Sequence, residues 1–484
     1  MNYLELLKLV SPEAIVVITA LAVLAIGLTI ERASIFGSAV AALGLVVAVG
    51  AVLLLPHNAT LFGGMLVITP LNSLFKIICI TLAFFTVLLA RTDRASRNPG
   101  EYLAMLLLAT IGLMLLVGSE ELLMIFIGLE LTGLSLYVMA AFDKTDVRSA
   151  EAGLKYFLFG STASAFTLFG ISFIYGMSGT TSLVAIGQRL TTESVQPLLA
   201  VGIVMTLIGF AFKIAAAPFH LWAPDAYQGA PVPSAAFIAS GSKVASFVVL
   251  GKIVLVGFGP LHGNADWHAM VAGWMPVLAA LAAFSIVVGN LVALAQSNVR
   301  RLLAYSAVAH AGYTLLGLVA GGRDGFSATL FYTTVYAVTL VGAFGVVALV
   351  HRETGGDDFS NFSGLSSRSP LLAGCMAIFM LSLAGMPPLA GFFGKFYLFS
   401  AALRAGANHG LLWLVALALF GSLISLYYYL IILKVIFMDE PATEISTFRV
   451  DWLQRTSLAV LAIAVLFLGV WPGALVAPIV ASVP

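Results

Sequence analysis

Long apolar runs separated by short polar loops fill most of this chain. About 20 consecutive apolar residues in a helix cross the hydrocarbon core of a bilayer, because each residue adds 1.5 Å. On this measure the pattern predicts about fourteen membrane-spanning helices and an all-α polytopic membrane protein. The expected spans are 12–30, 35–55, 70–91, 101–118, 121–142, 152–177, 197–226, 232–258, 270–294, 300–321, 327–351, 370–402, 409–437 and 453–480.

Two expected spans contain prolines that a continuous helix does not tolerate. Pro218 interrupts the seventh span, and Pro387 with Pro388 interrupts the twelfth. Proline lacks an N–H, so Pro218 would free the carbonyl of Ile214, and in hydrocarbon a freed carbonyl needs protein or a wet cavity as its partner. Both spans are therefore predicted to be broken helices.

Each broken helix is the fourth member of a set of five spans, the fourth to eighth and the ninth to thirteenth. Five is an odd number, so the two sets run in opposite directions through the membrane. Inverted repeats with discontinuous helices are typical of ion-coupled transporters, whose sites lie near mid-membrane. We predict a three-helix segment (1–100), two inverted five-helix repeats (101–260 and 261–440) and a C-terminal span (441–484).

The composition supports a membrane protein and narrows the functions open to it. Hydrophobic residues make up 61% of the chain and charged residues 9%, against about 25% charged residues in soluble domains. The 23 Lys and Arg against 22 Asp and Glu leave no basic surface for nucleic acid. Cys79 and Cys375 lie in separate apolar runs, and no GxGxxG or P-loop is present. No cofactor or metal is expected in this chain.

The charges in the loops predict the orientation of the chain. Short cytoplasmic loops retain Lys and Arg, so the side with more of them faces the cytoplasm. Both termini are therefore expected on the outer side, because the loops on the side of the termini hold only Lys8, Arg189, Arg323 and Arg404. The opposite loops hold Arg32, Arg91, Arg94, Arg97, Lys144, Arg148, Arg300, Arg301, Arg352, Arg368, Arg449 and Arg455.

Several charged residues lie deep inside the expected spans. A charged side chain near the bilayer centre costs on the order of 3 kcal/mol, so it persists where it faces water, a partner or a moving ion. Lys213 precedes the break at Pro218, while Glu130 and Lys243 lie near the midplane of the fifth and eighth spans. A carboxylate and an ammonium at one level offset each other's burial and can exchange a proton. The alternative is a static ion pair of Glu130 with Lys213 that fixes helix packing.

Lys395 has the same character as Lys213. It follows the break at Pro387 and Pro388, and the predicted orientation places both lysines on the outward side of their breaks, as inverted repeats require. The alternative for Lys395 is snorkelling of its amine to the outer interface. Snorkelling is favoured for three lysines nearer the span ends, Lys76, Lys252 and Lys434.

Two histidines and one further lysine are candidates for a proton relay. His220 follows the first break and could carry protons from the cytoplasmic side, although a histidine bonded to a loop is an equal alternative. His310, in the tenth span, is expected between Lys243 and Lys395, and a buried imidazole needs a partner in either case. For Lys155, an interfacial pair with Glu151 is favoured over a relay role.

Four motifs together resemble the antiporter-like membrane subunits of the proton-pumping NADH–quinone oxidoreductase (complex I), and most closely its N type. They are GLEL, KIAAAPFHLWAPDAYQGAPVPSAAFIASGSK, VRRLLAYSAVAHAGY and GMPPLAGFFGKF, in the expected order. The resemblance implies Glu130 and Lys213 as the coupled pair of the first half-channel, Lys243 as the central link and Lys395 as the residue of the second.

The resemblance also implies the setting in which the chain works. A bacterial inner membrane holds the subunit between other membrane subunits of a hetero-oligomer, while flavin, iron–sulfur clusters and quinone belong to other chains. The alternative within the same resemblance is a subunit of a multisubunit sodium/proton antiporter, although lysines disfavour direct sodium coordination, which uses oxygen ligands. A third interpretation is that the chain is a structural scaffold with fixed ion pairs.

Overall fold

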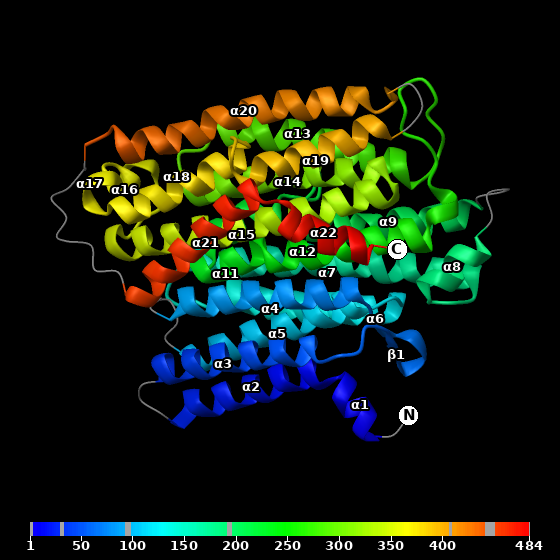
Figure 1. Cartoon of the computed structure of the whole chain (residues 1–484), viewed down its shortest axis with the longest axis horizontal. Helices are drawn as coiled ribbons and strands as arrows, with labels where there is room; N and C mark the ends of the chain where they lie inside the picture. The colour runs from blue at the N-terminus through cyan, green and yellow to red at the C-terminus, as the bar shows by residue number, and fades with distance from the viewer. Residues whose placement is uncertain are drawn as a thin grey trace.

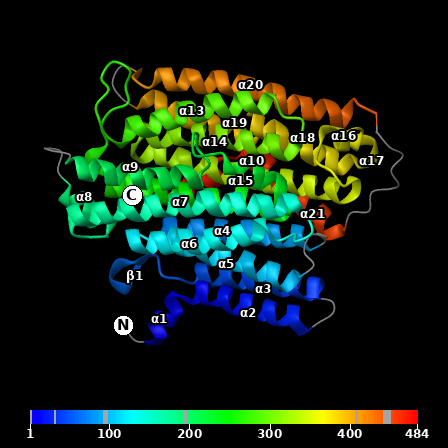
Figure 2. The ribbon, with the colours of Figure 1, turned by 180° about the vertical axis from the view of Figure 1, so that it is seen from behind.

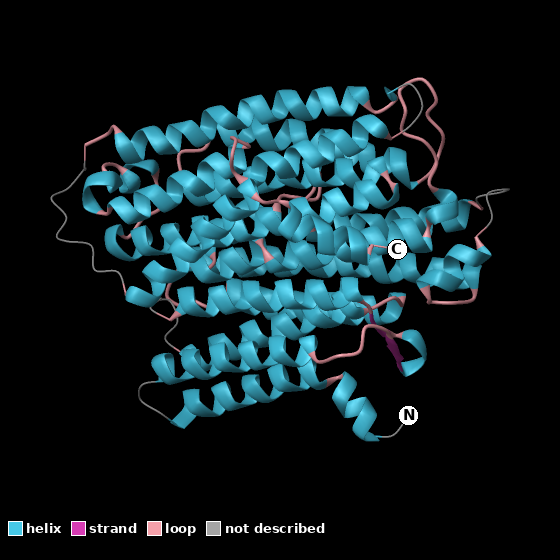
Figure 3. Ribbon diagram, viewed as in Figure 1, coloured by secondary structure: helices cyan, strands magenta, loops and turns pink. Residues whose placement is uncertain are grey.

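A computed structural model describes residues 3–29, 33–91, 98–190, 196–405, 409–440 and 451–483. Four arginines of the charge count, Arg32, Arg94, Arg97 and Arg449, lie outside these residues, so the structure does not bear on their part in the predicted orientation. The described chain is almost entirely helical (Figure 3), and its one sheet is a short antiparallel hairpin of β1 (Ala59–Leu61) and β2 (Leu66–Ile68).

Twelve helical runs in the described part of the chain are long and apolar enough to cross a membrane. Eleven are single helices: α2 (Ser11–Thr29), α3 (Ala33–Leu53), α4 (Pro70–Ala90), α5 (Pro99–Gly118), α6 (Leu122–Ala140), α7 (Val147–Ser178), α13 (Trp274–Leu294), α14 (Val299–Ala320), α15 (Gly322–Thr354), α20 (Leu412–Phe437) and α21 (Trp452–Val470). The twelfth joins α11 (Val232–Ala239), α12 (Gly241–Lys252) and the π-helical turn η2 (Ile253–Gly257).

Two further spans are broken helices, as the prolines predicted. The first consists of α9 (Pro197–Lys213) and α10 (Trp222–Gly229), and the second of α18 (Pro370–Ala384) and α19 (Ala390–Arg404). With these, the fourteen predicted spans are confirmed. Short elements complete the fold: α1 (Tyr3–Leu9), η1 (Phe62–Gly64), α8 (Leu183–Arg189), η3 (Gly259–Leu261), α16 (Phe359–Phe362), α17 (Leu365–Arg368) and α22 (Gly473–Ser482).

Two expected continuous helices are interrupted, and these predictions were wrong in detail. The eighth span changes direction at Ser240, whose φ of −114° and ψ of −81° separate α11 from α12. The expected last span, 453–480, ends at Val470, because Pro472 starts a new turn and the chain continues as α22. No proline marks the first interruption, so the sequence carried no signal for it.

The spanning helices run roughly parallel along the long axis of the molecule (Figures 1 and 2). One end holds the β1–β2 hairpin, α8 and both chain termini, and we call it the hairpin end. The opposite end holds α16 and α17. α5 runs toward the hairpin end and α13 runs away from it, so the two five-helix sets are inverted relative to each other.

Small residues let the helices approach closely. A Cβ at Gly289 would lie 2.4 Å from the backbone nitrogen of Ala309, and one at Gly312 would lie 2.7 Å from the carbonyl oxygen of Ala282. These glycines therefore hold α13 and α14 in backbone contact, the packing expected where lipid gives helices no hydrophobic drive to associate. The eighth span, α14 and α15 are the most buried spans and form the centre of the molecule.

Candidate functional site

Three lysines are buried in the middle of the molecule, one on each of α9, α12 and α19. Lys213 is 6%, Lys243 2% and Lys395 4% exposed. Each amine also lies over the face of a tyrosine ring, an arrangement that stabilises a cation. The distances from Nζ to the ring centroid are 5.5 Å for Lys213 and Tyr137, 5.7 Å for Lys243 and Tyr336, and 5.2 Å for Lys395 and Tyr313.

Glu130 on α6 and Lys213 on α9 face a narrow gap. A cavity of about 10 Å³ separates them and is lined also by Ser164, Thr167 and Gly209. The Ser164 hydroxyl donates a hydrogen bond to the Glu130 carboxylate. Among the described residues no ion pair within 4.0 Å joins Glu130 to Lys213. The gap has about the volume that one water molecule needs, so a single water fits between the two groups.

The first break follows Lys213 directly, because α9 ends at this residue. The chain then turns through Ala215, whose φ of 57° is left-handed. The indole N–H of Trp222 donates to the carbonyl of Phe212 at 3.0 Å, and the Ser285 hydroxyl accepts from the N–H of Ala217 at 2.9 Å. Side chains thus satisfy backbone groups that the break leaves free, so the break is stable within the membrane.

Lys243 lies three residues after the change of direction at Ser240. Its amine donates to the carbonyl oxygen of Ala307 on α14 at 2.9 Å. α12 belongs to the first repeat and α14 to the second, so Lys243 bonds across the junction of the two repeats.

His310 on α14 lies within a cluster of tyrosines. Its Nδ1 is 2.6 Å from the hydroxyl of Tyr332, and its Nε2 is 3.1 Å from the hydroxyl of Tyr429. Its ring also contacts Tyr336 and Tyr313, with centroids 4.8 and 5.6 Å away. Those two rings are the ones that face Lys243 and Lys395, so the imidazole lies between the two lysines.

Lys395 joins the two halves of the second broken helix. Its amine donates to the carbonyl of Ala384, the last residue of α18, at 2.9 Å, and to the hydroxyl of Ser422 on α20 at 2.8 Å. The amine thus points into the protein, where burial leaves no room for snorkelling. α9 and α19 both lie on the hairpin side of their breaks (Figure 1), so Lys213 and Lys395 occupy equivalent positions in the inverted repeats.

His220 and Lys155 lie on the other side of the first break, toward the α16 end. His220 is 7% exposed, and its Nδ1 is buried without a hydrogen-bond partner among the described residues. Lys155 makes the expected pair with Glu151 at 2.6 Å and a second pair with Asp225 at 2.7 Å. Asp225 also contacts Arg301 on α14 at 2.9 Å, so this carboxylate links the first repeat to the second.

Sequence reasoning missed Tyr137, Tyr313, Tyr332 and Tyr336 and misjudged two lysines. Lys76 and Lys252 are 4% and 5% exposed, so their expected snorkelling was wrong. Lys76 pairs with Glu13 at 2.6 Å, and Lys252 donates to Asn72 at 2.5 Å. The sequence carried a signal for one of these tyrosines. Tyr137 follows Glu130 by about two helical turns, so the two side chains lie on the same face of α6.

Within the described ranges, no group of three or more His, Cys, Asp or Glu side chains is arranged to hold a metal ion. Cys79 and Cys375 are free thiols, with Cys79 fully buried. The ionisable side chains described at the centre are lysines, a histidine, tyrosines and Glu130, all of which can carry protons.

Known proteins are similar to this chain in sequence and in fold. The family model described as "NADH:quinone oxidoreductase/Mrp antiporter, TM" matches residues 119–425. NADH-quinone oxidoreductase subunit N 2 of Acidobacterium capsulatum is 46% identical over 491 residues, with 98% of each chain covered. Subunit N of Desulforamulus reducens is 38% identical over 471 residues, with 96% of each covered.

A solved structure agrees with these relatives. A chain of respiratory complex I from Thermus thermophilus with bound aureothin superposes with a TM-score of 0.81 at 33% identity, covering 96% of this chain and 98% of that one. Sequence, length and fold therefore agree over nearly the whole chain. This multi-pass membrane protein belongs to the NADH:quinone oxidoreductase/Mrp antiporter family of membrane subunits, among the N-type subunits of NADH–quinone oxidoreductase.

Proposed function

We propose that this chain is the N-type proton-translocating subunit of a NADH–quinone oxidoreductase and that redox energy released in other subunits drives it. The observation that carries the proposal is the continuous set of contacts from Lys243 through Tyr336, His310 and Tyr313 to Lys395, buried in the centre of the bundle. Buried ionisable groups in a membrane protein mark an ion pathway.

Glu130 sets the charge state of Lys213 in this proposal. When the carboxylate approaches Lys213, it favours the ammonium, because an opposite charge stabilises the charged form. When it withdraws toward Ser164, the buried ammonium loses that support and releases its proton toward Lys243. Protons then pass by His310 to Lys395 and leave on the outer side. A return of Glu130 reloads Lys213.

The inward entrance is assigned to the region of His220 and Lys155. The unpartnered Nδ1 of His220 is available to accept or donate a proton beside the first break. Lys155 holds a charge at the same end through its two carboxylate partners. Both termini, which lie at the hairpin end, face the outer side of a bacterial membrane, in line with the loop charges.

The chain works within a hetero-oligomer, with other membrane subunits on either side of it in the bilayer. The domain division follows the repeats: 1–100, 101–260, 261–440 and 441–484. Flavin, iron–sulfur clusters and quinone reside in partner chains, and no cofactor binds here.

Substitution of Lys213 tests the function. Lys213→Ala in the assembled complex should greatly reduce NADH-driven proton uptake by inverted membrane vesicles, while a matched Lys434→Ala, at an exposed lysine of α20, should pump normally. NADH oxidation and native gels establish that each variant complex is assembled. Undiminished pumping by an assembled Lys213→Ala complex would refute the proposal.

A second candidate is a subunit of a multisubunit sodium/proton antiporter, because the family description covers both assemblies. The chains that co-purify with the protein separate the two. Flavin- and iron–sulfur-containing subunits identify the oxidoreductase, and their absence from an intact preparation identifies the antiporter.

A further inference from the structure

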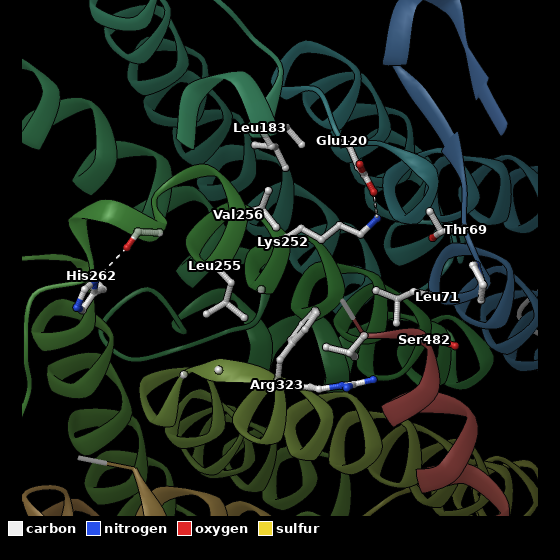
Figure 4. A pocket seen from close by; sticks show the side chains of 18 of the residues that line it. Thr69, Leu71, Glu120, Leu183, Lys252, Leu255, Val256, His262, Arg323 and Ser482 are labelled. Carbon is white, nitrogen blue, oxygen red and sulfur yellow. Dashed lines mark hydrogen bonds and ion pairs between the residues drawn. The ribbon is translucent and has the colours of Figure 1, made fainter. Parts of the chain in front are cut away.

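A cavity of about 820 Å³ opens at the hairpin end, outside the line of central lysines (Figure 4). Its walls are the ends of spanning helices: Leu71 of α4, Lys252 of α12, Trp274 of α13 and Phe326 of α15 lie in its lining. These helices end at the membrane surface, so the cavity lies at the depth of lipid headgroups and the first acyl carbons. Val256, in its wall, is 38% exposed, so the cavity reaches the surface of the chain.

The lining combines a large apolar wall with two cations. Apolar side chains, including Leu255, Val256 and Phe326, cover most of it. Lys252 and Arg323 carry positive charge, and Glu120 is the only acid in the described lining. A volume in the range of ligand pockets, with an apolar wall and few polar groups, is the usual form of a small-molecule site.

Both cations are held in place, and Arg323 retains free N–H groups. Lys252 donates to Asn72 and, at 2.8 Å, to the carbonyl of Val117, and it forms an ion pair with Glu120 at 3.8 Å (Figure 4). Arg323 donates from Nε and Nη2 to the carbonyl of Val480. A guanidinium has five N–H donors, so Arg323 can also bind an anionic oxygen.

Helix ends add to this charge pattern. The negative ends of α5 and α22 are neutralised by the bonds from Lys252 to Val117 and from Arg323 to Val480. α13 and α15 begin at the cavity without a side-chain cap at the N-terminus. The first turn of α15 holds Asp324, whereas that of α13 holds no acidic residue. The free N–H groups of Arg323 and the N-terminus of α13 can therefore bind an anion beside an apolar space.

We propose that this cavity binds one phospholipid with an anionic headgroup. The phosphate lies at Arg323 and the N-terminus of α13, and an acyl chain lies along Leu255, Val256 and Phe326. The open space agrees with this placement, because a Cβ built on Gly322 or Gly259 would meet no atom within 4 Å.

Photo-crosslinking of the intact complex in nanodiscs tests the site. The probe is phosphatidylglycerol that carries a diazirine on one acyl chain, compared with the same analogue of zwitterionic phosphatidylcholine. Phosphatidylglycerol should label peptides that contain residues 251–262 and 321–326, and phosphatidylcholine should label them several-fold less. Millimolar inorganic phosphate should compete poorly, because it lacks the acyl chains; full competition would identify a simple anion site and overturn the proposal.

Two variants test the contact with the headgroup charge and the space for the acyl chain separately. Arg323→Gln should lower labelling about fivefold at sub-saturating lipid, the usual effect of one cation on an anionic lipid. Val256→Trp should lower it by filling the acyl region. Arg404→Gln, at an exposed arginine on the same end of the molecule, should change nothing. The proposal would be overturned by equal labelling with both lipids or by labelling of a neighbouring subunit in place of this chain. It would also be overturned if Arg323→Gln had no effect in an assembled complex.

Discussion

Nδ1 of His310 lies 2.6 Å from the hydroxyl of Tyr332, and both side chains are buried at the centre of the second repeat. Because Tyr429 contacts the other ring nitrogen, the imidazole has a proton-carrying group at each nitrogen. This arrangement suits proton transfer, and it also fixes the ring in one orientation. The two roles respond differently to substitution.

His310→Phe should reduce proton uptake per NADH oxidised, because a phenyl ring fills the space but carries no proton. Tyr332→Phe removes one hydrogen bond, retains the ring and should give a smaller loss. Quenching of a pH-sensitive dye in inverted vesicles, normalised to NADH oxidation, measures both. If His310→Phe pumps normally in the assembled complex, the imidazole serves only to hold the helices together.

Asp225 joins Lys155 of the first repeat to Arg301 of the second, at 2.7 and 2.9 Å. These side chains are 28–39% exposed, so each pair contributes at most about 1 kcal/mol to stability. Asp225→Asn should therefore lower the melting temperature of the purified complex only slightly.

Lys155→Arg distinguishes a relay from a fixed ion pair at this site. Arginine keeps the positive charge and its carboxylate partners but does not release a proton. If Lys155 relays protons, the variant should assemble normally and pump more slowly. Pumping at the normal rate would assign Lys155 to the ion pair alone, the interpretation that its spacing from Glu151 favours.

The spans and their breaks could be predicted because their causes are local. A bilayer fixes the length of an apolar run, and proline removes a backbone donor wherever it stands, so Pro218 and Pro387 marked both breaks from the sequence. The break at Ser240 has no such residue. Its conformation depends on contacts between helices that no local pattern records.

The partners of the buried lysines could not be predicted for a related reason. Lys252 lies near the end of its span, where a single helix would let its amine reach water. In the folded chain Asn72 and Val117 enclose that amine, and they come from positions about 180 and 135 residues away. Tyr313, Tyr336 and Tyr137 likewise approach lysines from other helices. The sequence thus predicts how deep a residue lies in the membrane, but not which residues of other helices lie beside it.

Asp357 should make the stability of the α16 end depend on pH. Burial raises the pKa of its carboxyl group, but the hydrogen bond with His351 and the charge of Arg300 lower it more, so the pKa lies below its usual value. A carboxylate of lowered pKa stabilises the fold above its unfolded pKa of about 4, and this stability is lost as the pH falls through the lower folded value.

Asp357→Asn should therefore destabilise the protein near neutral pH, by about 3 kcal/mol, because the buried Arg300 loses its carboxylate and keeps only the backbone carbonyls of Tyr227 and Ala230 as partners. Wild type and variant should converge as the pH falls below about 4. Thermal unfolding at a series of pH values measures this, with Asp324→Asn at an exposed aspartate as the control. A constant difference across the series would mean that Asp357 does not act through its charge.

Gly391 allows the second broken helix to close. A Cβ at this position would lie 1.8 Å from the carbonyl oxygen of Ser382, so α19 packs directly on the backbone of α18. Gly391→Ala should force α19 away by a fraction of an ångström or more, and overpacking of this kind costs about 1–3 kcal/mol. Lys395 lies one turn further along α19, so its bond to Ala384 should weaken as well.

Gly374→Ala provides the matched control for this prediction, because the position lies on α18 and an added Cβ would meet nothing within 4 Å. We expect Gly391→Ala to lower both the melting temperature and the proton uptake of the complex, and Gly374→Ala to change neither. Equal behaviour of the two variants would show that the break tolerates a wider separation of its halves. A loss of pumping with an unchanged melting temperature would instead mean that the position of Lys395 is more sensitive to this contact than the fold is.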